Sequence, residues 1–62
     1  MTETQEIILN SLGTLARLHP QQRLGQIIYN YVCSQCPNND CFYIEDEKLL
    51  KILEKELDKY SH

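Results

Sequence analysis

Three stretches of this sequence repeat apolar residues every three to four positions. This spacing places the apolar side chains on one face of an α-helix, so we predict helices over about residues 2–18, 20–34 and 46–60. An irregular loop is expected over residues 35–45. The predicted architecture is all-α, a compact three-helix domain that takes up residues 1–62 as a single domain.

The apolar faces of the three predicted helices consist mainly of large aliphatic residues. They are Ile8, Leu12, Leu15 and Leu18, with Ile7 beside them, in the first helix; Leu24, Ile27, Ile28 and Tyr31, with Val32 beside them, in the second; and Leu49, Leu50, Ile52, Leu53 and Leu57 in the third. Three short helices cannot hide all of these side chains. We therefore expect Ile7, or Leu50 with Leu57, to stay exposed.

The size of the chain limits how much its core can contribute to stability. A chain of 62 residues buries roughly 60% of its unfolded surface. A core of this size contributes only about 3–5 kcal/mol, so small domains often depend on a metal, a disulfide or a second subunit. The sequence offers a candidate for each of these.

Local signals mark the helix ends and the loop. Thr2 and Gln5 have the spacing of a capping box, and Pro20 suits the first position of a new helix. Residues 37–40, Pro-Asn-Asn-Asp, predict a turn, because Asn and Asp bond their own backbone and tolerate left-handed conformations.

The two glycines lie inside predicted helices. Gly13 costs up to about 1 kcal/mol relative to alanine in a helix, so it marks either a close contact or a weak point. Gly25 is expected to let another backbone approach its helix.

The charge balance argues against nucleic acid as a partner. The chain has nine acidic and six basic residues, a formal net charge of −3 at pH 7, and its lysines alternate with acidic residues. Binding to a phosphate backbone usually needs a basic face.

We see no signal peptide and no apolar run near the roughly 20 residues that span a bilayer. We therefore expect a soluble, cytoplasmic protein without a membrane or nucleic-acid partner.

Three cysteines, Cys33, Cys36 and Cys41, gather at the predicted loop. A Cys-x-x-Cys pair is a common half of a tetrahedral zinc site, and a third thiolate lies within reach. The fourth ligand would be His19, His62 or a group from another chain. His19 is a poor ligand, because it lies at the far end of the second helix, roughly 20 Å from Cys33. Zinc is thus the one cofactor that the sequence suggests, and its site is one ligand short.

The same thiols have other interpretations. In one interpretation, Cys36 and Cys41, which bracket the turn, form a disulfide that closes a short loop. In another, Cys33 packs as a small apolar residue, and Cys36 and Cys41 are free thiols. Thioredoxin-type catalysis needs the Cys-x-x-Cys at a helix start, whereas this pair lies at a helix end. An odd number of cysteines fits a reducing compartment better than a secreted disulfide framework.

Two spaced motifs follow one another in the second half of the chain. Residues 23–30 read Arg-Leu-Gly-Gln-Ile-Ile-Tyr-Asn, and residues 40–50 begin Asp-Cys-Phe-Tyr-Ile-Glu-Asp and end Leu-Leu. The pattern, R-x-G-Q-x-x-x-N and then D-x-F-Y-x-x-D-x-x-L, resembles that of a family of small bacterial and phage proteins. The resemblance covers about half of the chain and implies no activity. The frame that it implies consists of Arg23, Gly25, Gln26, Asn30, Phe42, Tyr43 and Asp46, to which the cysteines would be an addition.

Most of these frame residues have a structural interpretation. We expect the Asn30 amide to satisfy backbone groups of the returning loop, and Arg23 to pair with an acidic residue such as Asp46 or Glu47.

Phe42 and Tyr43 have two interpretations. Aromatic residues on loops are frequent interface anchors. Alternatively, Phe42 caps the core while Tyr43 keeps its hydroxyl in water.

The sequence contains no recognisable catalytic constellation. No histidine or other base lies at a sequence spacing from Ser11, Ser34 or Ser61 that would indicate nucleophilic catalysis, and the sequence has no glycine-rich phosphate loop. We therefore predict a non-enzymatic protein-interaction or regulatory module, with a homodimer as one form of it. The main alternative is a zinc-binding or thiol redox-sensing protein built on the three cysteines, and a weaker one is a helix-turn-helix DNA binder.

Overall fold

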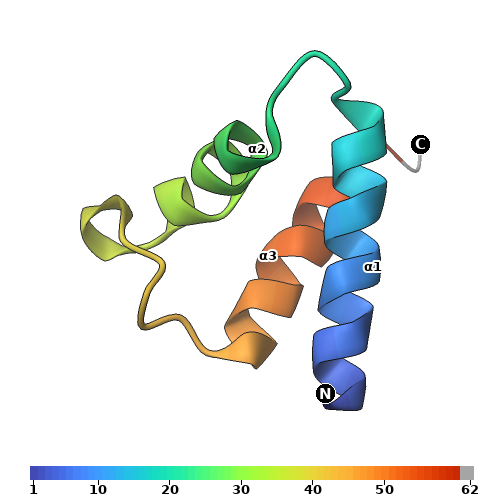
Figure 1. The fold of residues 1–62 in the computed structure, drawn as a ribbon. Coiled ribbons are helices and arrows are strands. Elements are labelled where there is room, and N and C mark those ends of the chain that lie inside the picture. The colour runs from blue at the N-terminus through green and yellow to red at the C-terminus, as the bar shows by residue number, and fades with distance from the viewer. Residues whose placement is uncertain (61–62) are drawn as a thin grey trace.

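The computed structural model describes residues 1–60, which form three α-helices and two short 3₁₀ helices and contain no strand (Figure 1). The elements are α1 (Glu3–Leu18), α2 (Leu24–Tyr31), η1 (Cys33–Gln35), η2 (Pro37–Asn39) and α3 (Asp46–Asp58). This arrangement confirms the predicted all-α, three-helix fold. Its Cα radius of gyration is 11.2 Å.

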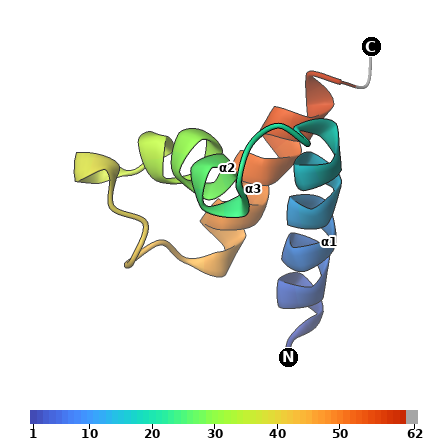
Figure 2. The same cartoon turned by 45° about the horizontal axis from the view of Figure 1, so that its top comes forward.

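The helices α1 and α3 pack against each other more extensively than any other pair. The helix α2 packs on both but with fewer contacts, and the η1–η2 segment extends from its end. Figures 1 and 2 both show this segment on the side of the molecule away from α1. The loop is therefore the part of the chain that the helices support least.

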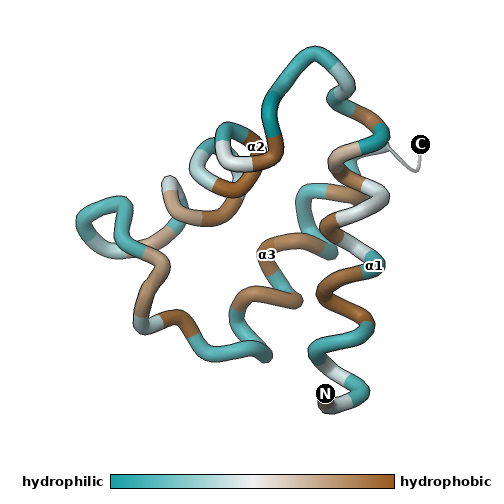
Figure 3. The backbone as a smooth tube through the Cα atoms, in the orientation of Figure 1, coloured by the Kyte–Doolittle hydropathy of each residue, from teal (hydrophilic) through white to brown (hydrophobic). Residues whose placement is uncertain are grey.

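The core lies where the three helices meet. Its buried side chains are Ile8, Leu15, Ile27, Val32 and Leu53, all from the predicted apolar faces. The apolar stretches of each helix are visible in Figure 3. Ile7 stays exposed, as expected, whereas Leu50 and Leu57 are half-buried against the core and not exposed. With so few buried side chains, the loss of any one of them removes a large part of the core.

Both halves of the predicted capping box are present at the start of α1. The Thr2 hydroxyl accepts a hydrogen bond from the Gln5 amide at 3.1 Å, and the Gln5 side chain accepts one from the Thr2 amide at 3.0 Å. These bonds satisfy two amides that a helix start leaves without partners. They fix the first turn of α1 as the sequence predicts.

The second helix is shorter than predicted at both ends. Pro20 is the second residue of a turn in which the Gln22 amide donates to the His19 carbonyl at 3.1 Å, and proline favours this turn position. The α-helix therefore begins at Leu24, where the Gln26 side chain accepts from the Arg23 amide at 2.8 Å. After Tyr31 the chain tightens into 3₁₀ geometry, and α3 likewise ends at Asp58, before the predicted residue 60.

Among residues 1–60, no helix combines the length and the apolar character needed to cross a bilayer.

We expect Leu15→Ala to lower the free energy of unfolding by about 2–5 kcal/mol, because Leu15 is fully buried and the change leaves a cavity. This loss is comparable to the stability expected of the whole domain, so far-UV circular dichroism should show loss of the helical signal. The matched control is Leu9→Ala on the same helix. Leu9 is 53% exposed, and its truncation should change stability by no more than about 0.5 kcal/mol.

Gly13→Ala should raise the free energy of unfolding by about 0.5–1 kcal/mol, measured by urea titration. A Cβ atom built at Gly13 meets no atom within 4 Å, so glycine there is the weak point and not the close contact. The expected close approach at Gly25 is wrong for the same reason, since its Cβ position is also open. A destabilised Gly13→Ala variant would contradict this interpretation.

Candidate functional site

A disulfide bond between Cys33 and Cys41 ties the end of α2 to the segment that leads into α3. The two Cα atoms are 4.9 Å apart. Cys33 is buried in η1, and Cys41 is half-buried against the hydrophobic core. A bridge between Cys36 and Cys41 was one expectation from the sequence, and it is wrong. Cys33 and Cys41 both face the core, whereas Cys36 faces a separate hollow.

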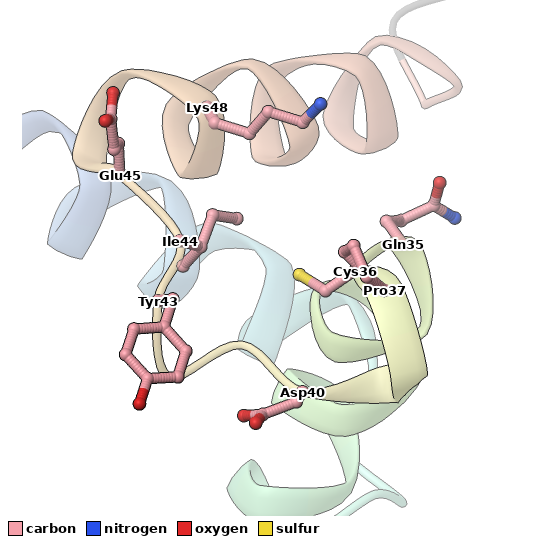
Figure 4. A pocket seen from close by; sticks show the side chains of 8 residues that line it. All are labelled: Gln35, Cys36, Pro37, Asp40, Tyr43, Ile44, Glu45 and Lys48. Atoms are coloured by element: carbon pink, nitrogen blue, oxygen red, sulfur yellow. The ribbon is translucent and has the colours of Figure 1, made fainter.

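Cys36 keeps a free thiol. It is half-buried, and its Sγ donates to the Val32 carbonyl at 3.5 Å. Figure 4 shows the sulfur directed into a surface hollow of about 320 Å³, on the side of Ile44. The hollow is lined by Gln35, Cys36, Pro37, Asp40, Tyr43, Ile44, Glu45 and Lys48. It therefore brings one thiol, one aromatic ring and charges of both signs together.

The predicted zinc ligands are not gathered into one site. Cys33 and Cys41 are joined to each other, and His19 bonds to Tyr60, while His62 lies outside the described residues. Within the part of the chain that the structure describes, no three His, Cys, Asp or Glu side chains are grouped to hold a metal ion. Zinc binding thus stays a prediction for the reduced chain.

The turn at residues 37–40 has the predicted chemistry. Asn38 and Asn39 both have left-handed backbones, with φ of 58° and 56°, which asparagine tolerates well. The Asp40 carboxylate accepts a hydrogen bond from the Phe42 amide at 2.9 Å. These features reverse the chain and return Cys41 to the core.

The two aromatic residues after this turn point away from the protein. Phe42 is 80% exposed and Tyr43 is 84% exposed, and their rings meet edge to face with centroids 4.8 Å apart. Cys41 and Ile44 on either side pack against the core, and the Ile44 amide donates to the Cys41 carbonyl at 3.4 Å. Residues 42 and 43 thus form the outer corner of a turn. The expectation that Phe42 caps the core is wrong, because its neighbours occupy the inward positions.

We call Phe42 and Tyr43 together the aromatic tip. The rest of the predicted frame lies elsewhere and has structural contacts. Gln26 caps the start of α2, and the Asp46 carboxylate accepts from the Gln5 side chain at 3.3 Å. That bond joins the first turns of α1 and α3. The predicted ion pair of Arg23 with Asp46 or Glu47 is not present among residues 1–60.

Asn30 stabilises the corner between α1 and α2. Its amide donates to the Gln22 side chain at 3.1 Å, and Gln22 donates to the Tyr31 hydroxyl at 3.3 Å. The expected contact of Asn30 with the returning loop is therefore wrong. The loop is tied back by the disulfide, which leaves the Asn30 side chain to hold the α1–α2 corner.

His19 joins all three helices, a role that the sequence does not reveal. Its ring stacks on Tyr31 with centroids 4.9 Å apart, and its Nε2 lies 2.8 Å from the Tyr60 hydroxyl. His19 and Tyr60 are 41 residues apart in the chain, so no local pattern could pair them. The one available signal is that His19 and Tyr60 fall at or next to predicted helix ends.

We found no protein family model, curated protein or solved structure that matches this chain. The fold and the site define a small all-α domain with three helices, one disulfide and an exposed aromatic tip.

Asn30→Ala should lower the free energy of unfolding by about 0.5–1.5 kcal/mol, because it removes the bond to Gln22. The control is Asn10→Ala in α1, which gains the same helix propensity but loses none of these contacts. Thermal melts of both variants measure the difference. Equal melting temperatures for the two variants would contradict a structural role for Asn30.

Proposed function

We propose that this protein is a non-enzymatic interaction module that presents the aromatic tip to a protein partner. The observation that carries the proposal is the position of Phe42 and Tyr43, which are almost fully exposed although the residues on either side pack inward. Burying two exposed aromatic rings would remove a large apolar area from water. A small domain with little core gains no stability from leaving them in solvent.

The loop that carries the aromatic tip is held at several points. The disulfide fixes Cys41, the Asp40 carboxylate fixes the Phe42 amide, and Ile44 packs on the core. Ordering a segment before it binds reduces the conformational entropy lost on association. These constraints favour a tip that binds in its present form.

The surroundings of the aromatic tip also suit a protein partner. The adjacent hollow has Tyr43 and Ile44 on its wall and the charged groups of Asp40, Glu45 and Lys48 around them. An apolar centre with a polar rim is the usual composition of protein interfaces. The net charge of −3 favours a protein over a nucleic acid as the partner.

Two side chains that could serve catalysis are engaged in structural bonds. The Ser34 hydroxyl donates to the Asn30 carbonyl at 2.5 Å, and the His19 ring bonds to Tyr60. These contacts favour a non-enzymatic role, because nucleophilic catalysis needs a hydroxyl and a base within hydrogen-bonding reach of each other.

Replacing both Phe42 and Tyr43 with alanine should abolish partner binding and leave stability within about 0.5 kcal/mol, because exposed side chains contribute little to folding. The first measurement is size-exclusion chromatography with light scattering over a range of concentrations. A dimer that is lost in the double variant identifies a second copy of the chain as the partner. The matched control is Tyr29→Ala on α2, which removes a ring that is 53% exposed and distant from the tip in sequence.

If the wild-type protein is monomeric, three proteins serve as baits in affinity capture from the native host: the wild type, the variant with alanine at both positions 42 and 43, and Tyr29→Ala. The proposal predicts proteins that are retained by wild type and by Tyr29→Ala but lost with the double variant. Identical capture by all three baits would contradict it.

A further inference from the structure

The third cysteine lies one turn along the chain from Cys33, one of the two bridged residues. The Cys36 amide donates to the Cys33 carbonyl at 3.0 Å, so the backbones of the two residues lie one 3₁₀ turn apart. The Cys36 sulfur contacts the carbonyl of Val32, the residue next to Cys33. It also opens into the hollow whose wall includes Asp40, the residue before Cys41, and Ile44, three residues after it (Figure 4).

We propose that Cys36 attacks the Cys33–Cys41 disulfide and that the three cysteines form a thiol–disulfide switch. The Cys36 thiol first loses its proton to water, and the resulting thiolate attacks and forms a new bond to the Cys33 sulfur. The bond between Cys33 and Cys41 breaks, and Cys41 leaves as a thiolate that takes up a proton. One disulfide and one thiol are present before and after the step, so it needs no external oxidant or reductant.

Burial sets the direction of this exchange. Cys33 is buried, whereas Cys41 is half-buried. A thiolate is costly in an apolar environment, so Cys41 is the better leaving group of the two. The product is therefore a bridge between Cys33, the first residue of η1, and Cys36, the residue after it, with Cys41 left as a free thiol.

The consequence of the exchange is release of the loop that carries the aromatic tip. In the structure the disulfide is the covalent link between the end of α2 and the residue before Phe42. Once Cys41 is free, the tip keeps its attachment to the core through Ile44 but loses the bridge. The coupling to binding rests on the proposed function, whereas the exchange itself does not.

The exchange can be followed by locating the free thiol. Oxidised wild-type protein is incubated in a buffer containing a trace of reduced glutathione, sampled over minutes to hours and quenched with acid. The free thiol is alkylated with one reagent and the bridged cysteines, after reduction, with a second. Tandem mass spectrometry then places each label. We expect the first label to begin on Cys36 and to move in part to Cys41.

Two variants serve as controls, and circular dichroism checks that each keeps its helices. The Cys36→Ser variant lacks the attacking thiol, so Cys41 should carry no first label from internal exchange. Glutathione can still free a cysteine by forming a mixed disulfide with the other, and the added mass of glutathione identifies such molecules. The Cys41→Ser variant keeps only the Cys33 and Cys36 thiols, and oxidised glutathione, which takes up their two electrons, should convert them into the Cys33–Cys36 bridge.

Three results would overturn the switch: a first label that stays on Cys36, a first label that moves to Cys33, or a Cys41→Ser variant that keeps two free thiols in oxidised glutathione. Failure of the aromatic-tip variants to change binding would contradict the proposed function and leave this exchange unaffected.

Discussion

The constraint on which this structure depends is the small number of side chains that it can bury. Five residues, drawn from all three helices, form the buried cluster, and Leu15, Ile27 and Leu53 are the most completely enclosed. The helices α1 and α3 share most of the packing, while α2 contributes a single short face. The segment after α2 therefore has little core to pack on, and its position depends on other links.

Those links are polar and covalent, and each acts at one end of an element. The capping box fixes the start of α1, Gln5 joins it to Asp46 at the start of α3, and His19 joins the opposite ends of the helices through Tyr31 and Tyr60. The disulfide joins the loop, at Cys41, to the end of α2, at Cys33. Single hydrogen bonds of this kind contribute about 0.5–1.5 kcal/mol each, a substantial share of the stability of so small a domain.

The loop combines two features that a purely structural connection does not require. It turns two aromatic rings outward, and it contains a thiol next to a disulfide. In our proposals these features form one unit, in which the bridge fixes the aromatic tip and Cys36 supplies the means to release it. The proposed function follows from the inward positions of Cys41 and Ile44, which leave the outward ones to Phe42 and Tyr43. The proposed exchange follows from the position of Cys36 one turn from Cys33.

The sequence by itself determined the presence of three helices, the capping box and the turn at residues 37–40, because these depend on residues within a few positions of each other, but it placed both ends of the second helix wrongly. It also identified most of the core, since apolar spacing defines a helix face. Only the tertiary structure decided which cysteines pair, which way Phe42 points and what His19 contacts. These outcomes depend on how the chain returns after the turn and on contacts between residues up to 41 positions apart. No local pattern encodes such distances, because they arise when the three apolar faces pack together.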